Sequence, residues 1–173
     1  MKESFQSEPW VVVVKGGSIL VDKQDVEIAC GFGWKIKNEY VMHFFRNSRT
    51  KTTDSLALHR LIAGTPPDMV TDHIDGNPRN NTRANLRSCT RAQNSANMQS
   101  HGRRGLTSRY KGVHRARREG KWVAMIGVAG KIRRIGGYAT EEAAARAYDD
   151  AARKHFGEFG RYNFPREGEQ CAL

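Results

Sequence analysis

The sequence predicts an α+β protein built as a small β-β-α motif with N-terminal strands, followed by a three-stranded antiparallel sheet packed on one helix. Two observations carry this expectation. Short runs of β-branched and aromatic residues alternate with glycine and asparagine turns. One alanine-rich segment near the C-terminus has the length and the end signals of a single helix. A chain of 173 residues is long enough for one medium or two small domains.

The N-terminal fifty residues predict a β-rich extension. The runs that indicate strands are Trp10–Val14, Ile19–Val21, Gly33–Lys37 and Tyr40–Phe45. Asn38-Glu39 separates the last two and is suited to a hairpin turn. Leucine and isoleucine between Leu56 and Ile62 then predict a short helix that ends near Gly64.

The next segment predicts a strand, a turn, a returning strand and a helix. Residues 69–71 indicate a short strand that runs into Asp72-His73, and residues 75–78 have turn chemistry. Residues 86–88 return the chain, and Thr90 is a suitable cap for a helix that carries Asn94 and Asn97. Regular alternation would aim the side chains of Asp72 and His73 at opposite faces, so their cooperation requires an irregular strand end.

The C-terminal part predicts a sheet covered by a helix. Six glycines between Gly112 and Gly137 separate β-branched and aromatic residues, which indicates three strands with short turns. Thr140 is a candidate cap for a helix that contains six alanines and ends before Gly157. Small alanine side chains let such a helix lie close to a sheet, which leaves the other sheet face for the cations.

The charge is concentrated in that sheet. Between His101 and Ile135 the chain has eleven basic residues and one acid, against a net charge of +11 for the whole protein. Such a cluster predicts a polyanionic partner, most simply double-stranded DNA. Three dispersed cysteines argue against a disulfide scaffold and a structural zinc, and fit a reducing cytosol. The longest apolar run has five residues, so we expect no membrane span.

Asp72, His73 and Asn94 are the candidates for chemistry. A carboxylate and an amide oxygen are hard ligands that suit magnesium, and a histidine can act as a general base near neutral pH. Together these groups are what phosphodiester hydrolysis needs. The alternative is that the Asp-His pair and the asparagines only satisfy the backbone of a turn.

The same segment resembles the His-Asn-His (HNH) nuclease family, in the phage homing-endonuclease form whose last histidine is replaced by asparagine. The motifs that carry the resemblance are Leu58-His59-Arg60-Leu61, Asp72-His73-Ile74-Asp75-Gly76-Asn77, Asn80-Asn81, Asn85-Leu86-Arg87 and Gln93-Asn94. The resemblance implies that His73 is the general base and that Asp72 and Asn94 hold one Mg²⁺ or Mn²⁺ ion. It also implies that Asn85 orients the loop and keeps His73 in its productive tautomer. For His59 and Arg60, packing or phosphate contact is favoured over catalysis.

Residues from about Ser108 to Pro165 resemble the plant ethylene-response-factor (Apetala) DNA-binding domain. The matching motifs are Tyr110–Val113, Gly120–Trp122, Ile135-Gly136, Glu141–Asp149 and Asn163–Pro165. The family binds DNA through its three-stranded sheet, so the resemblance implies a DNA-binding set in the corresponding region. That set is Lys111, Arg115, Arg117, Arg118, Arg133 and Arg134.

These expectations define a two-part DNA enzyme. The predicted organisation is a nuclease domain at 1–100, a basic linker at 101–108, an Apetala-like domain at 109–166 and a tail at 167–173. By resemblance the chain is a site-specific homing endonuclease located in the cytoplasm, that of a bacterial host if phage-encoded. We expect a monomer on DNA, with a dimer left open, and neither a membrane nor a small-molecule cofactor. The alternatives are a non-catalytic DNA-binding regulator and a nuclease of low specificity.

Overall fold

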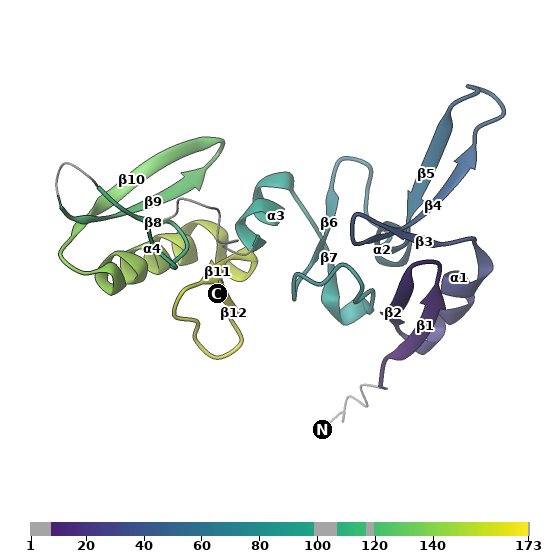
Figure 1. Cartoon of the computed structure of the whole chain (residues 1–173), viewed down its shortest axis with the longest axis horizontal. Helices are drawn as coiled ribbons and strands as arrows, with labels where there is room; N and C mark the ends of the chain where they lie inside the picture. Colours follow the sequence, from purple (N-terminus) through teal and green to yellow (C-terminus); the bar gives the residue numbers. More distant parts are fainter. Residues whose placement is uncertain (1–7, 99–106, 117–119, 173) are drawn as a thin grey trace. The chain divides into compact units, whose positions relative to one another are not determined.

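A computed structural model describes residues 8–98, 107–116 and 120–172, and it shows a mixed α and β protein (Figure 1). Four α-helices and several small, mainly antiparallel sheets lie within these residues. The chain forms two compact units, with the division between Cys89 and Thr90.

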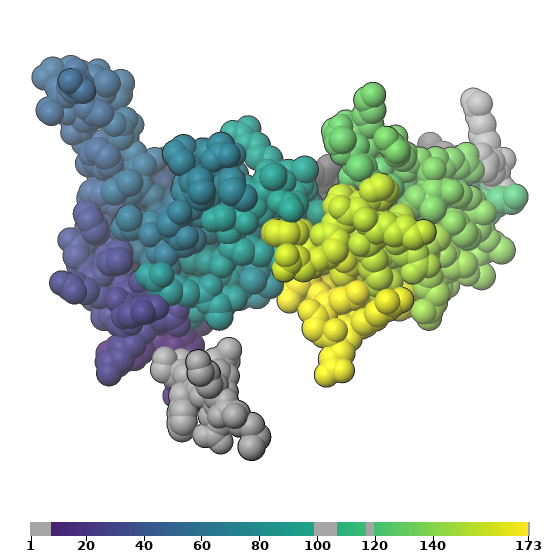
Figure 2. Space-filling model, turned by 180° about the vertical axis from the view of Figure 1, so that it is seen from behind, coloured from purple at the N-terminus to yellow at the C-terminus, as the bar shows by residue number. Residues whose placement is uncertain are grey.

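The first unit contains three antiparallel sheets and two short helices. Its elements are β1 (Trp10–Val14), β2 (Gly17–Val21), α1 (Val26–Gly31), β3 (Lys35–Lys37), β4 (Tyr40–Arg46), β5 (Thr53–Ala57), α2 (Leu58–Ala63), β6 (Val70–His73) and β7 (Leu86–Cys89), with 3₁₀ turns η1 (Lys23–Asp25) and η2 (Arg83–Asn85). β1 pairs with β2, β3 and β5 flank β4, and β6 pairs with β7. The hairpin of β4 and β5 extends beyond the rest of this unit in both views (Figures 1 and 2).

One apolar core holds the first unit together. It joins residues from β1, β2, β4, α2 and β7, with Val21, Val41 and Leu58 fully buried. The buried carboxylate of Asp25 accepts two hydrogen bonds from Arg83, at 2.7 and 2.8 Å, and so ties η1 to the segment before β7. The N-terminal strands therefore support the small β6–β7 hairpin from one side of the core.

The predicted N-terminal elements are present with small changes in their bounds. Asn38 and Glu39 form the turn between β3 and β4 with φ values of 50° and 68°, the left-handed pair that a two-residue hairpin turn needs. α2 ends at Gly64, whose φ is 60°. α1 and β5 were not expected, because six and five residues of mixed polarity give no clear period.

The second unit contains one three-stranded sheet and two helices. Its elements are α3 (Arg91–Asn97), β8 (Val113–Arg115), β9 (Trp122–Val128), β10 (Lys131–Tyr138), α4 (Glu141–Phe156), the 3₁₀ turn η3 (Gly157–Phe159), β11 (Arg161–Tyr162) and β12 (Gln170–Cys171). The sheet is antiparallel with β9 in the middle, and β11 pairs with β12 in parallel. This confirms the predicted arrangement of a three-stranded sheet and one helix.

α4 covers one face of the sheet (Figure 1). Ala144, Ala145 and Ala152 are fully buried, so the helix lies close to Ala124 and Ile126 of β9. Thr140 caps the helix by accepting a hydrogen bond from the Ala143 N–H at 3.1 Å, as predicted. Gly112 has a φ of 73° and lies against the ring of Tyr148, where any Cβ would collide.

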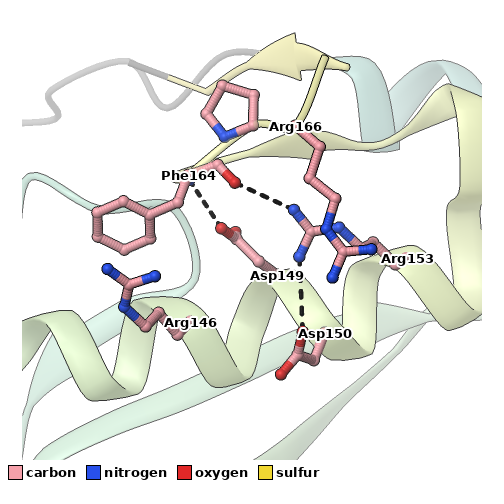
Figure 3. Close-up of a pocket in the computed structure, with 7 residues that line it drawn as sticks. Arg146, Asp149, Asp150, Arg153, Phe164 and Arg166 are labelled. Carbon is pink, nitrogen blue, oxygen red and sulfur yellow. Dashed lines mark hydrogen bonds and ion pairs between the residues drawn. The ribbon is translucent and has the colours of Figure 1, made fainter. Parts of the chain in front are cut away.

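Asp149 on α4 anchors the segment that follows β11. Its carboxylate accepts hydrogen bonds from the backbone N–H groups of Asn163 and Phe164, both at 2.8 Å. Arg153 donates to the Phe164 carbonyl at 3.0 Å (Figure 3). Arg153 also forms a two-point ion pair with Glu169. A pocket opens between α4 and residues 164–166, and Arg153 in its lining forms ion pairs with Asp150 and Glu169.

Candidate active site

The β6–β7 hairpin positions the predicted catalytic pair. β6 stays regular up to its last residue, with Asp72 opposite Arg87 and His73 opposite Leu86. The irregular strand end that we expected is therefore absent from this described hairpin. Because side chains alternate along a strand, Asp72 and His73 have different neighbours.

Asp72 is buried and forms an ion pair across the hairpin. Its Oδ2 accepts a hydrogen bond from Arg87 Nε at 2.9 Å and forms an ion pair with Nη2 at 2.8 Å. The Asp72 side chain is 4% exposed and that of Arg87 is 14% exposed. An ionised carboxylate needs such a partner when it is removed from water. Arg87 therefore keeps a negative charge available inside the hairpin.

His73 lies in a cluster of rings. Its ring centroid is 5.1 Å from that of His59 on α2, and both rings lie near Tyr40 at the start of β4. His59 and His73 are buried, whereas Tyr40 is exposed at the edge of the cluster. His59 is thus packed against the proposed general base, which agrees with the favoured packing role. The pair is separated by thirteen residues, so only the tertiary fold brings it together.

Burial keeps both histidines neutral at physiological pH. Desolvation, with smaller contributions from the nearby His73 and Arg60, lowers the pKa of His59 to about 4. Desolvation also lowers the pKa of His73, although a hydrogen bond with Asn81 and the carboxylates of Asp75 and Asp72 oppose that shift. A neutral imidazole can accept a proton, so this environment suits a general base.

Asn85 fastens the loop that connects the two strands. Its Oδ1 accepts from the Asp75 N–H at 2.9 Å, and its Nδ2 donates to Asp75 Oδ1 and to the Asn80 carbonyl, at 2.9 and 2.8 Å. Asp75 Oδ2 in turn accepts from Asn80 Nδ2 at 2.8 Å. The geometry agrees with a loop-orienting residue; the further role in selecting the His73 tautomer stays a prediction.

Arg60 stabilises the loop between α2 and β6. Its guanidinium donates to the carbonyls of Met69 at 2.8 Å, Pro66 at 3.0 Å and Thr65 at 3.4 Å. These carbonyls belong to the loop after the helix, so Arg60 orders the approach to β6. The structure therefore favours a packing role for Arg60 over contact with phosphate.

Asn94 lies on α3, which belongs to the second compact unit. The helix begins with a capping box in which Thr90 Oγ1 accepts from the Gln93 N–H and Gln93 Oε1 accepts from the Thr90 N–H. The side chain of Asn94 is half-buried. Because Asp72 and Asn94 lie in separate units, their joint action on one metal ion remains a prediction.

The basic residues of β10 do not share one sheet face. Arg134 is opposite Met125, whose neighbours in β9 are buried against α4, so Arg134 lies on the face away from the helix. Arg133 is opposite Ile126 and so lies on the helix side, where it is nevertheless exposed. The expected single cationic face is thus divided between the open face and the edge of the sheet. Ile132, which is 73% exposed, shares the open face with Arg134.

The other predicted DNA-binding residues have different surroundings. Arg115 is exposed at the end of β8, with its guanidinium 5.7 Å from the Trp122 ring centroid. Lys111 differs from the expectation, because its ammonium donates to the carbonyls of Ala96 and Met98 at 2.6 and 2.7 Å. Arg117 and Arg118 lie outside the described residues, as does most of the predicted linker.

Asp72 and Asn94 carry oxygen donors, the type that suits a hard divalent cation. No group of three or more His, Cys, Asp or Glu side chains that could hold a metal occurs in ranges 8–98, 107–116 and 120–172. The predicted pair of Asp72 and Asn94 consists of one carboxylate and one amide, and so it is not a group of this kind. Such a pair leaves coordination positions for water and phosphate, which is how magnesium is usually bound.

Comparison with known proteins identifies the class of this hairpin. Residues 57–96 match the HNH endonuclease family. The matched segment runs from the end of β5 through α2, β6 and β7 into α3, so it contains all four candidate catalytic and metal-binding residues. The β6–β7 hairpin and its helices are therefore a nuclease motif.

A longer comparison extends the assignment to most of the chain. An uncharacterized HNH endonuclease of Acanthamoeba polyphaga mimivirus is 33% identical over 138 residues, which cover 75% of this chain and 70% of the viral protein. The chain belongs to the HNH endonuclease family. Members of this family are nucleases and generally use divalent metal ions.

The C-terminal part is similar to plant transcription factors. An APETALA2-like protein of Oryza sativa subsp. indica is 46% identical over 63 residues, 36% of this chain and 14% of the plant protein. An ethylene-responsive transcription factor of Arabidopsis thaliana is 52% identical over 58 residues, 32% of this chain and 31% of that protein. These partial matches point to DNA as a partner. No solved structure matches the chain significantly.

Among the described residues, no helix is both long and apolar enough to cross a membrane.

Proposed function

We propose that this protein is a site-specific, metal-dependent DNA endonuclease of the homing type. The observation that carries the proposal is the buried Asp72-His73 pair at the end of β6, inside the segment that matches the HNH endonuclease family. A buried neutral histidine and a buried carboxylate that needs an ion pair, on successive residues of one strand, are costly if the strand serves only to pack. Catalysis explains them more directly than backbone satisfaction does.

In the proposed reaction, His73 takes a proton from the water that attacks the scissile phosphorus. Its lowered pKa keeps the imidazole unprotonated, so it can act as a base near neutral pH. His59 and Tyr40 pack around the ring and limit its rotation. Asn85 holds the loop after His73, and so fixes the end of the strand that presents the base.

Asp72 and Asn94 are the proposed ligands of one Mg²⁺ or Mn²⁺ ion. When bound, a divalent ion supplies positive charge that stabilises the phosphate oxygens and the leaving oxygen. Arg87 fixes the carboxylate of Asp72 in the hairpin. The capping box at Thr90 fixes the first turn of the helix that carries Asn94.

The sheet of the second unit is the proposed DNA-docking surface. Arg115, Arg133 and Arg134 are exposed on its strands, and Arg117 and Arg118 belong to the same proposed set. Counterion release from these cations would supply affinity, and contacts from the strands would supply specificity. Lys111 is not included, because its ammonium is engaged with carbonyl groups of the second unit itself.

The decisive test is conversion of supercoiled DNA that carries segments of the source genome. We expect the wild type to convert it with Mg²⁺ but not with EDTA, and the His73→Ala protein to be slower by about 10²–10⁴-fold, the usual contribution of a general base. The ratio of open-circular to linear product distinguishes a nick from a double-strand break. Equal conversion by wild type and His73→Ala would overturn the assignment of His73.

A second candidate function is sequence-specific DNA binding without cleavage. The similarity of the C-terminal part to plant transcription factors favours it. A regulator would bind its DNA equally well with and without magnesium and would leave the strands intact. Tight binding without conversion, across several divalent ions and DNA segments, would favour this function over the nuclease.

A further inference from the structure

Helix α3 belongs to two parts of the protein at once. By sequence it is the last helix of the nuclease motif, since the family match ends at residue 96 and Asn94 lies inside it. By packing it belongs to the second compact unit, which begins at Thr90. Only Thr90 separates α3 from β7 along the chain. The unit with the proposed DNA-binding sheet therefore holds the helix that carries a proposed metal ligand.

A buried arginine and a half-buried lysine hold the C-terminal end of α3. Asn97 Oδ1 accepts a hydrogen bond from Arg161 Nε at 2.9 Å, and both residues are 4% exposed. Arg161 Nη1 also donates to the Cys171 carbonyl at 3.0 Å, which connects it to β12. Lys111 Nζ donates to the carbonyls of Ala96 and Met98. The last carbonyls of a helix have no partner within it, so cations are well suited to this end.

These contacts are costly to form. Desolvation, together with the nearby charge of Arg161, lowers the pKa of Lys111 to about 8. Bringing two like charges into a buried place is unfavourable unless their contacts are needed. α3 has only seven residues, and helices this short are not stable without tertiary contacts. The position of α3 therefore depends on the contacts at its C-terminal end as well as on the capping box at its N-terminal end.

We propose that Arg161 and Lys111 are positioning residues of the nuclease, which hold α3 so that Asn94 is presented to the metal ion. This inference rests on the proposed role of Asn94 as a ligand. It assigns to the second unit a part in metal binding in addition to docking on DNA. It also implies that loosening the C-terminal end of α3 weakens metal binding while DNA affinity is retained.

The test compares Arg161→Met with Arg153→Met in the full-length protein. Both arginines tie down the segment between β11 and β12, but Arg153 reaches Phe164 and Glu169 rather than α3. Arg153→Met therefore controls for general loosening of that segment. Lys111→Met is a second variant that removes the other contact and keeps the aliphatic stem, in case Arg161→Met does not fold.

Four measurements separate positioning from a merely structural role. They are Mn²⁺ affinity by calorimetry, hydrogen exchange of the α3 peptide in metal-free protein, DNA affinity in EDTA, and the Mg²⁺ dependence of cleavage. For Arg161→Met we expect Mn²⁺ to bind about tenfold more weakly, as loss of one charged hydrogen bond allows. We also expect faster hydrogen exchange in α3 and a matching shift in the Mg²⁺ concentration that gives half-maximal cleavage. DNA affinity should stay within about twofold of wild type, because the DNA contacts are made elsewhere on the surface. Arg153→Met should match the wild type in Mn²⁺ affinity.

Unchanged Mn²⁺ affinity in Arg161→Met and in Lys111→Met, from a wild type that binds Mn²⁺ and cleaves, would overturn the positioning inference alone. Equal losses in Arg161→Met and Arg153→Met would also overturn it, because the effect would then come from the C-terminal segment. A wild type that neither binds Mn²⁺ nor cleaves DNA would overturn the proposed function, and the inference with it.

Discussion

The burial of His59 beside His73 makes the stability of the first unit depend on pH. The pKa of His59 falls from 6.5 to about 4, chiefly because its ring is desolvated. Between these two values the unfolded chain binds a proton that the native protein does not. The free energy of unfolding therefore falls as the pH is lowered from 6.5 to about 4. Above pH 6.5, His59 is neutral in both states, and its burial carries no protonation penalty. At about 1.4 kcal/mol per pKa unit, the loss amounts to about 3 kcal/mol.

Between pH 6.5 and 4, the decrease in the free energy of unfolding should be about 3 kcal/mol smaller for His59→Gln than for the wild type, because the variant lacks the titrating group. Urea unfolding of the first unit can be followed by the fluorescence of Trp34, which is buried in its core, with Trp10 and Trp122 replaced by phenylalanine. His155→Gln is the matched control, because His155 is exposed on α4 in the second unit.

The pKa of His59 can also be measured directly from the NMR shift of its Cε1 proton. Since His73 is the second cause of the lowered value, His73→Gln should raise the pKa of His59 part of the way back. A midpoint for His59 near 6.5 in the wild type, or the same loss of stability in His59→Gln, would refute the reasoning from burial.

Three further predictions concern the site and the DNA surface. Asn85→Ala should lower the free energy of unfolding of the first unit by about 1–3 kcal/mol, measured in urea, because it leaves buried loop groups without partners; no loss would contradict its role as the fastener of the loop. The acid limb of single-turnover cleavage should lie below pH 6.5, since burial lowers the pKa of His73, and a limb above that value would count against His73 as the base. Arg134→Ala should reduce the slope of log Kd against log salt by about 0.9, the value for one phosphate contact, whereas Lys154→Ala on α4 should leave the slope unchanged. Equal slopes in both variants would remove Arg134 from the DNA surface.

Much of the local structure followed from short-range sequence signals. The hairpin turn at Asn38, the end of α2 at Gly64 and the caps at Thr90 and Thr140 each depend on one or two residues whose backbone preferences are strong. The sheet–helix arrangement of the second unit was predictable for a similar reason, because glycines delimit its strands and alanines mark the buried face of its helix.

The candidate site was only partly predictable. Sequence motifs indicated His73 as a base, but the packing of His59 and Tyr40 around it joins residues from β4, α2 and β6. The regular end of β6 was not expected either. Its register continues because Leu86 pairs with His73 and Arg87 neutralises Asp72, both of which are cross-strand effects.

By itself, the sequence determined the kinds of chemistry and the short elements, because residue type and local spacing control charge, caps and turns. The tertiary structure decided which groups meet. It separated Arg133 from Arg134 by strand alternation and directed Lys111 to the end of α3. It also placed α3 in the second unit through Arg161, a contact between residues sixty-four positions apart. Such contacts depend on how whole elements bury their apolar faces, and no local pattern encodes that outcome.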